Sequence, residues 1–281
     1  MALKHLRKTI HDALREDAAK EDITVNTLVS EKTRAKAHVI VKQRGILCGL
    51  DVVAEVFHEM DPYAKIMRLS TDAKLVRPGS IVMMVNASAR ALLSAERTAL
   101  NFLGHLSGVA TLTRRFVDTL KGTKIKIYDT RKTTPGLREL EKYAVTCGGG
   151  HNHRMDLKEM AMVKDNHYQV LGTLKDELLK FKKIHPDISI EVECESIQQV
   201  RTALEARADI IMLDNMSFFA MQEAIGVIRG FPEYHPDIEL SGGVTLETIE
   251  RYSKLDVDRI SIGAFTHSAP ALDVSMEIVD E

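Results

Sequence analysis

Apolar residues near the start of the chain recur with a helical period. Leu3, Leu6, Ile10, Ala13 and Leu14 follow the spacing of side chains on one face of an α-helix. We therefore expect an amphipathic helix that ends before residue 21.

The next eighty residues alternate between strand and helix patterns. Apolar and polar residues alternate from Ala35 to Val41, and helical spacing returns from Val52 to Met60. Lys65 to Leu69 and Ile81 to Val85 are typical of strands, and Arg77-Pro78-Gly79 between them is typical of a turn. Strands with helices on one face indicate an N-terminal domain of α+β character.

The rest of the chain repeats a strand-then-helix order. Two helices are expected first, Ala89 to Leu103 and Val109 to Leu120. Short apolar runs then alternate with helix-length amphipathic segments. The runs are Lys124 to Tyr128, Met160 to Val163, Ile188 to Val192, Asp209 to Leu213, Ile238 to Leu240 and Arg259 to Ile262. This βα repetition predicts parallel strands. A full eight-stranded barrel takes about 250 residues, so a shorter, incomplete β/α barrel is favoured over a doubly wound sheet.

Composition and charge exclude several classes of function. Apolar residues make up 44% and charged residues 28%, which is typical of a globular protein. Lys and Arg number 38 against 40 acidic residues, so no overall positive field favours nucleic-acid or membrane binding. An anionic ligand must then be held by a local cluster. Charges occur throughout Met1 to Asp17, which argues against a signal peptide or membrane span and favours the cytoplasm.

The three cysteines do not form a recognisable framework. Cys48, Cys147 and Cys194 are odd in number, widely spaced and without a CxxC pair, so we expect free thiols rather than disulfides or a zinc site. Cys147 beside the glycines at 148–150 could be a nucleophile, but a packing role is favoured.

Polar residues cluster directly after the predicted barrel strands, where β/α barrels carry their active-site loops. The strand-end residues are Asp129 to Gly136, Lys164 to His167, Glu193, Asp214 with Asn215, Ser241-Gly242-Gly243, and Gly263. Glycine loops after late strands often present backbone N–H groups to a phosphate. The layout therefore predicts a phosphorylated substrate.

Each of these features also has a structural explanation. Arg131-Lys132 could be a solvated charge pair, although its position after a strand favours a binding role. Glu193 and Asp214 could cap the helices that follow them. Their shared edge favours Mg²⁺ instead, since this ion needs only one or two carboxylates besides substrate oxygens. Ser241-Gly242-Gly243 could be a bare turn as well as a phosphate loop.

Two further features lie between the first and second barrel strands. His151 and His153 could ligate a metal, but without a third ligand at a recognisable spacing a substrate or loop role is favoured. Gly148-Gly149-Gly150 is compatible with either a flexible loop or a close approach of backbone to ligand.

Several long motifs, in order, resemble those of the quinolinate phosphoribosyltransferase family. They are Glu96 to Leu103, Leu106 to Thr111, Thr130 to Arg138, Glu141 to Val145, Gly148 to Arg154, Lys164 to His167, Glu191 to Glu193, Met212 to Asn215, Ser241 to Gly243 and Ser261 to Ala264. The resemblance spans nearly the whole chain.

The resemblance implies an overall architecture. An N-terminal α/β sandwich would cover residues 1–108, and an open, incomplete β/α barrel of about seven strands, as in type II phosphoribosyltransferases, would cover 109–266. The segment 267–281 would return to the first domain. Family members are homo-oligomers, dimers or hexamers, in which Arg97 would reach the barrel of a partner subunit.

The resemblance also implies a reaction and a set of site residues. The enzyme would be a glycosyltransferase that joins quinolinate to the ribose of phosphoribosyl pyrophosphate with loss of CO₂, giving nicotinate mononucleotide for NAD biosynthesis. Mg²⁺ would bind with phosphoribosyl pyrophosphate, and no organic cofactor would be needed. Residues for quinolinate would be Arg97, Arg131, His153, Arg154 and Lys164. Residues for phosphoribosyl pyrophosphate would be Lys132, Glu193, Asp214, Ser241, Gly242, Gly243 and Gly263. The catalytic set would be Lys132, Lys164, Glu193 and Asp214, with Glu193 and Asp214 also near the metal.

The sequence departs from the family pattern at two places and leaves rival functions open. Residues 16–24 lack the expected glycines, and Ser80 stands where Asp often follows the glycine, so local N-terminal loop geometry is in doubt. One rival is a homologue that uses nicotinate or another base, or a molybdenum-transport-associated relative. Another is a phosphate-ligand sensor without catalysis, since a fold alone does not establish activity.

Overall fold

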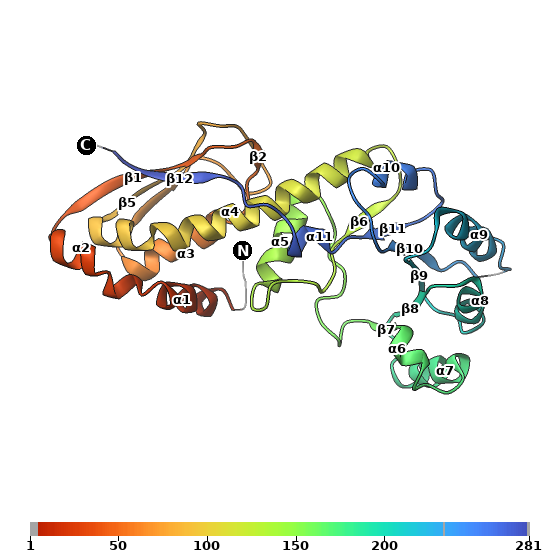
Figure 1. Cartoon of the computed structure of the whole chain (residues 1–281). Helices are drawn as coiled ribbons and strands as arrows, with labels where there is room; N and C mark the ends of the chain where they lie inside the picture. Colours follow the sequence, from red (N-terminus) through yellow and green to blue (C-terminus); the bar gives the residue numbers. More distant parts are fainter. Residues whose placement is uncertain (1–4, 233, 280–281) are drawn as a thin grey trace. The chain divides into compact units, whose positions relative to one another are not determined.

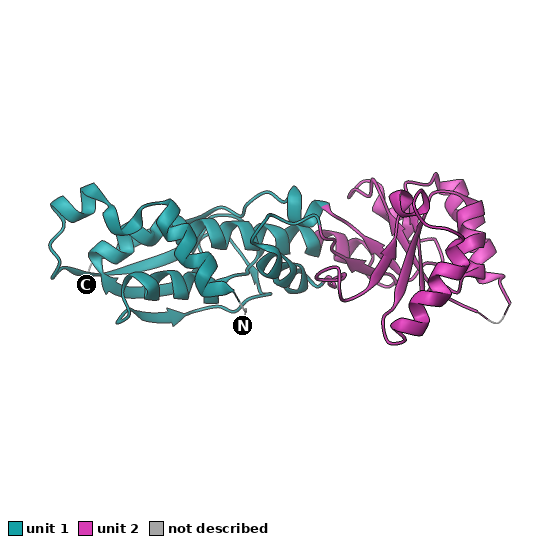
Figure 2. Ribbon diagram, turned by 90° about the horizontal axis from the view of Figure 1, so that it is seen from below, with its two compact units in different colours: residues 1–114, 132–149, 264–281 teal, residues 115–131, 150–263 magenta. Residues whose placement is uncertain are grey.

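The computed structural model describes residues 5–232 and 234–279, and the chain divides into two compact units (Figure 2). The first unit combines the N-terminal part up to residue 114 with residues 132–149 and the C-terminal part from 264. The second contains residues 115–131 and 150–263. The boundary expected between 108 and 109 falls inside one helix, α4 (Ala89–Thr119).

The first unit contains a four-stranded antiparallel sheet in the order β12-β1-β5-β3. Its strands, with the small β2/β4 pair, are β1 (Arg34–Val41), β2 (Gly45–Ile46), β3 (Lys65–Arg68), β4 (Leu75–Val76), β5 (Ile81–Ser88) and β12 (Val274–Val279). Ala37, Val39 and Val41 alternate along β1 and are completely buried, as a strand with one covered face requires. Because β12 pairs with β1, the C-terminal segment belongs to this sheet.

Helices cover one side of that sheet (Figure 1). The helical elements of the first unit are α1 (Leu6–Glu16), the 3₁₀ turn η1 (Ala19–Glu21), α2 (Ile23–Leu28), α3 (Leu50–Met60), α4, α5 (Arg138–Gly148) and α11 (Ala264–His267). The patterns that predicted α1, β1, α3, β3 and β5 are confirmed to within a few residues; Leu3 lies outside the described residues. The unit is the expected α/β sandwich.

The two helices expected at 89–103 and 109–120 are wrong, because α4 is continuous from Ala89 to Thr119. Gly104 and Gly108, in the gap between the two expected helices, lie where the C-terminal segment crosses α4. A Cβ at Gly104 would stand 2.9 Å from the carbonyl oxygen of Leu272, and one at Gly108 only 2.2 Å from that of Pro270. These glycines therefore permit a close backbone approach and do not end the helix.

Replacing Gly108 with alanine is expected to destabilise the protein by about 1–3 kcal/mol, because the added methyl group must displace the Pro270 backbone. The matched control is Gly226→Ala in α9 (Phe218–Arg229), where nothing lies within 4 Å of the new Cβ. That change should stabilise by about 0.5–1 kcal/mol, since alanine loses less backbone entropy in a helix. Urea unfolding of both variants measures the difference. Equal stability for the two would contradict the packing argument.

The second unit is built on a six-stranded parallel sheet in the order β6-β11-β10-β9-β8-β7. Its strands are β6 (Lys126–Tyr128), β7 (Ala161–Val163), β8 (Ile190–Cys194), β9 (Ile210–Asp214), β10 (Asp237–Ser241) and β11 (Arg259–Ser261). The helices are α6 (Asp165–Tyr168), α7 (Leu174–Ile184), α8 (Ile197–Glu205), α9 and α10 (Ile249–Tyr252). All six predicted strands are confirmed.

The barrel of the second unit is open. Among the described residues no strand pairing joins β6 to β7, although an isolated parallel bridge between Tyr128 and His151 extends the β6 edge. The structure therefore has six strands and one bridge where about seven strands were expected. The central strands β8, β9 and β10 are mostly buried, and Ile211, Val192 and Leu240 are completely inaccessible, as expected for parallel strands in a barrel core.

Two observations bear on the expectations about cysteines and membranes. Cys48, Cys147 and Cys194 are all buried free thiols, as predicted. None of the helices in the described part of the chain combines the length and apolarity that crossing a bilayer requires.

Candidate active site

The predicted site residues of the second unit lie at one edge of the parallel sheet. Glu193 is near the end of β8, Asp214 ends β9, and Ser241 ends β10. Lys164 directly follows β7, and Gly263 follows β11. Since the strands are parallel and neighbouring, their carboxyl ends meet at the same edge. The order along this edge is set by the sheet: Ser241 is in register with Asp214, and Glu193 with Met212.

Lys164 and Glu193 form an ion pair between neighbouring strand ends. The ammonium group of Lys164 donates directly to Oε2 of Glu193. The Glu193 side chain is 11% exposed and that of Lys164 40% exposed. Two of the four residues predicted as catalytic are therefore adjacent at the end of the sheet, and the cation partly neutralises one of the two carboxylates proposed for the metal.

A second cluster joins Asp214 to the glycine loop after β10. Nδ2 of Asn215 donates to Oδ2 of Asp214 at 2.6 Å, and the backbone N–H of Asn215 donates to the carbonyl of Ser241 at 3.2 Å. Asn215 has a positive φ of 52°, and Gly242 and Gly243 have φ of 91° and 59°. These two glycines therefore supply a left-handed backbone that other residues rarely adopt. The acidic strand end and the predicted phosphate loop are in direct contact.

Two arginines follow β6 and its bridge: Arg131 comes three residues after Tyr128, and Arg154 three residues after His151. Burial and the guanidinium of Arg131 lower the pKa of Arg154, although an arginine keeps its charge in proteins. Arg154 is only 8% exposed, and its Nη1 donates to the carbonyl of Met160 at 2.8 Å. Two guanidinium groups that repel each other in a partly buried place are suited to a ligand with two negative charges.

His153 lies beneath this edge, in contact with a buried acidic pair that the sequence did not reveal. Its Nδ1 accepts the backbone N–H of Arg154 at 2.8 Å, so the ring proton is on Nε2. Nε2 lies 3.0 Å from Glu191 and 3.6 Å from Glu239, and both glutamates are completely buried. The ring therefore lies between the backbone of Arg154 and two buried carboxyl groups. A quinolinate contact by His153 stays a prediction.

Alternation along the strands explains the buried acids. Glu191 and Glu193 are two residues apart on β8, and Glu239 and Ser241 are two residues apart on β10, so each pair faces the same side of its strand. Glu191 and Glu239 form a layer below the strand-end residues. Burial raises the pKa of Glu191 to about 7 and that of Glu239 to about 8.

Replacing Glu239 with glutamine is expected to stabilise the protein at alkaline pH. The folded protein holds the Glu239 proton more tightly than the unfolded chain, whose glutamate pKa is about 4.3, so stability falls as the pH rises from there to about 8. Glu239→Gln removes this loss and should be more stable than the parent by about 1–3 kcal/mol at pH 8, and by less at pH 5. Urea unfolding at both values measures it, with Glu205→Gln on exposed α8 as control. An equal increase in the free energy of unfolding at both pH values would contradict the idea that ionisation of buried Glu239 destabilises the protein.

The remaining predicted residues belong to the first unit. Arg97 is exposed on α4, and Lys132 is exposed in the loop before α5, where its carbonyl accepts the Thr266 hydroxyl at 2.7 Å. The structure thus brings together the predicted residues of the second unit, and Arg97 and Lys132 lie in the other unit.

A contact that the sequence did not predict stabilises the loop carrying Lys132. Glu141 on α5 is completely buried; its Oε1 lies 2.8 Å from Nε2 of His105, and its Oε2 accepts the backbone N–H of Thr134 at 3.0 Å. The sequence signal that could have indicated it is helical spacing, since Leu137, Ala144 and Val145 place Glu141 on an apolar face. Glu141 therefore connects the loop to α4.

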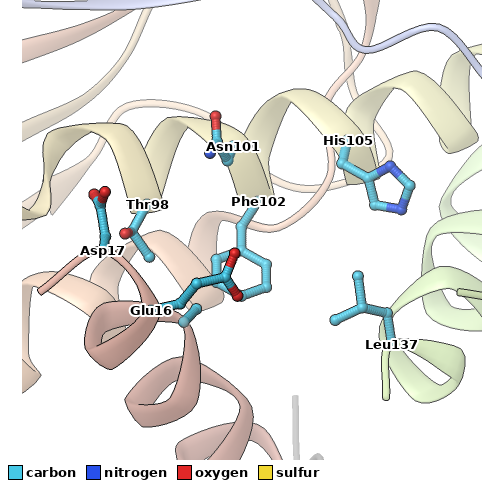
Figure 3. Close-up of a pocket in the computed structure, with 8 residues that line it drawn as sticks. Glu16, Asp17, Thr98, Asn101, Phe102, His105 and Leu137 are labelled. Atoms are coloured by element: carbon cyan, nitrogen blue, oxygen red, sulfur yellow. The ribbon is translucent and has the colours of Figure 1, made fainter. Parts of the chain in front are cut away.

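The same unit contains a pocket of about 330 Å³ between α1, α4 and Leu137. In Figure 3 the side chains of Thr98, Phe102 and His105 project from α4 along one side of it, and those of Glu16 and Asp17 come from the end of α1. Its two carboxylates do not suit an anionic substrate. The pocket is not among the predicted sites.

Cys147 lies close to Cys48 and Asp72, and the three side chains could in principle hold a metal ion. The Asp72 carboxylate already accepts the backbone N–H groups of Gly49 and Leu50 and the hydroxyl of Tyr143. These contacts assign Asp72 to the start of α3, and the position of Cys147 agrees with the packing role.

Comparison with protein families matches two models that together cover most of the chain. Quinolinate phosphoribosyl transferase, N-terminal domain, matches residues 22–107, and the C-terminal domain model of the same family matches residues 109–277.

Named relatives and solved structures agree with this match. A nicotinate-nucleotide pyrophosphorylase [carboxylating] of Mycobacterium leprae is 39% identical over 97% of this chain and 96% of its own length. A probable enzyme of the same name from Bacillus subtilis is 38% identical over 97% of this chain and 93% of its own length. The crystal structure of NadC from Streptococcus pyogenes covers 100% of both chains with a TM-score of 0.92 at 39% identity. The chain therefore belongs to the quinolinate phosphoribosyltransferase family.

Proposed function

We propose that this protein transfers the phosphoribosyl group of phosphoribosyl pyrophosphate to quinolinate with loss of CO₂, giving nicotinate mononucleotide for NAD biosynthesis. The observation that carries the proposal is the cluster of predicted residues at the strand-end edge, where Lys164 pairs with Glu193 and the end of β9 contacts the end of β10. Arg131 and Arg154 would bind quinolinate beside this cluster. Quinolinate has two adjacent carboxylates, and each can accept paired hydrogen bonds from an arginine. The names of the relatives, nicotinate-nucleotide pyrophosphorylase [carboxylating], support the same reaction.

The sugar phosphate would occupy the acidic half of the edge. Glu193 and Asp214 present carboxylate oxygens at neighbouring strand ends, and hard oxygen ligands suit Mg²⁺ that is also bound by substrate oxygens. When bound, the ion would neutralise charge on the departing pyrophosphate. The 5-phosphate would lie on Ser241, Gly242, Gly243 and Gly263. No organic cofactor takes part in this reaction.

The reaction needs two bond changes at different atoms. The pyridine nitrogen of quinolinate forms a bond to C1 of the ribose as the bond from C1 to pyrophosphate breaks. The resulting cationic ring accepts the electron pair released when the adjacent carboxylate leaves as CO₂, and the ring carbon then takes a proton from solvent. Lys164 and Lys132 would stabilise negative charge during these steps.

Arg97 would complete the quinolinate site of a partner subunit. It is exposed on α4 in the first unit, as a residue that acts on another chain must be. In this proposal the enzyme is a homo-oligomer, dimer or hexamer. Mixing inactive Arg97→Ala with inactive Glu193→Ala subunits should restore part of the activity, because some mixed sites then contain both residues.

The experiment that tests the function measures pyrophosphate and CO₂ released by the purified protein with quinolinate, phosphoribosyl pyrophosphate and Mg²⁺. Equal amounts of both products support the proposal. Pyrophosphate release with nicotinate alone would favour a homologue that uses another base. Binding of the sugar phosphate without any pyrophosphate release, unaffected by Glu193→Ala, would favour a sensor.

A further inference from the structure

Asn215 is the residue between two parts of the site that bind different groups of one substrate. It follows Asp214 at the end of β9 and touches the loop after β10. Asp214 is proposed to serve the ribose and the metal, and the loop to serve the 5-phosphate. Neither assignment gives Asn215 a function of its own.

Asn215 makes three contacts that connect the end of β9 with the loop after β10. Its side-chain N–H donates to the Asp214 carboxylate at 2.6 Å. Its backbone N–H donates to the carbonyl of Ser241 at 3.2 Å. Its side-chain oxygen lies so close to Gly242 that a Cβ there would be 2.2 Å away. One exposed asparagine thus contacts both the Asp214 carboxylate and the neighbouring loop.

The backbone of Asn215 supports a specific role over a packing role. Its φ of 52° is unfavourable for most residues with a side chain, and such conformations concentrate at functional sites, where surrounding contacts maintain them. Asparagine tolerates this region better than most residues. Glycine would adopt this backbone conformation equally well. What asparagine adds is the side-chain amide and its hydrogen bond to Asp214.

We propose that Asn215 is a positioning residue that sets the distance between the Asp214 carboxylate and the Ser241–Gly243 loop, so that ribose and 5-phosphate of one molecule bind together. This proposal rests on the proposed function, because it assumes that both elements bind phosphoribosyl pyrophosphate. A charge-assisted hydrogen bond to Asp214 is stronger than one between neutral groups, so its loss should be measurable in binding.

The test is Asn215→Gly, which keeps the positive φ and removes the amide. We expect the KM for phosphoribosyl pyrophosphate and the Mg²⁺ concentration for half-maximal rate to rise about 10-fold or more, since a hydrogen bond to a charged group is lost. The KM for quinolinate should change little. The matched control is Arg207→Gly, at a φ of 58° before the opposite end of β9, which should leave both KM values unchanged.

A double-mutant cycle tests the connection to the loop. Gly242→Ala alone should raise the KM for phosphoribosyl pyrophosphate, and it should do so less in the Asn215→Gly background, where the side-chain oxygen no longer meets the new methyl group. Additive effects, or a lowered melting temperature with unchanged KM values, would overturn the proposal.

Calorimetry separates this proposal from the proposed function. Binding of phosphoribosyl pyrophosphate with Mg²⁺ can be measured whether or not the wild-type protein turns over quinolinate. Weaker binding by Asn215→Gly with an inactive wild-type protein would support the positioning role and refute the reaction. Unchanged binding by Asn215→Gly with an active wild-type protein would refute the positioning role and support the reaction. Wild-type protein that does not bind the sugar phosphate would refute both.

Discussion

Replacing Lys164 with methionine is expected to lower kcat about 100- to 1000-fold while changing the KM for quinolinate much less. Methionine keeps the length of the side chain and removes its charge. Lys164 contacts Glu193 at the strand-end edge, where the proposed reaction would develop charge on the departing groups. An interaction that strengthens in the transition state affects turnover more than ground-state binding.

Steady-state kinetics of CO₂ release measures this effect. The control is Lys175→Met on exposed α7, in the same unit, which should behave like the parent. The Lys164 side chain is 40% exposed, so its ion pair contributes little to stability. The variant should therefore remain folded. An unchanged kcat would remove Lys164 from the catalytic set and leave it as a partner of Glu193.

Quinolinate is expected to exceed nicotinate in kcat/KM by about 10⁴-fold, because a site that binds two carboxylates with two guanidinium groups loses one charge-assisted interaction when one carboxylate is absent. Arg154 is only 8% exposed, so water compensates poorly for a missing carboxylate. Competition between the two bases, followed by product analysis, measures the ratio.

The same experiment identifies the arginine responsible. Arg131→Met should reduce the preference for quinolinate, since only one of the two proposed guanidinium groups then remains to bind its two carboxylates. Arg131→Lys should restore only part of it, because lysine has the charge without the paired donor geometry. Similar kcat/KM values for both bases in the wild-type protein would refute the two-cation subsite and favour a nicotinate-dependent relative.

The apolar pattern was sufficient to predict the parallel strands and the edge at which they converge. Each apolar run from β6 to β11 is followed directly by the polar residues of the candidate site, as with Lys164 after β7. The carboxyl ends of parallel neighbouring strands share an edge, so positions far apart in the sequence could be placed together without any knowledge of side-chain contacts.

The same pattern failed where function depends on contacts between distant segments. The break expected in α4 was wrong because Gly104 and Gly108 reflect the approach of the C-terminal segment, which local spacing does not contain. Glu191 and Glu239 were not recognised as a buried acidic layer, because each stands in an apolar strand and only the folded sheet brings both to His153.

Local periodicity thus determined which segments form strands and helices and which strand ends carry the chemistry, since both follow from the burial of apolar side chains along one element. Only the tertiary structure decided the partners of the buried polar groups, such as Glu141 with His105 and Thr134. A buried polar group must find a hydrogen-bonding or charged partner, and that partner is chosen by the packing of elements and not by its neighbours in the chain.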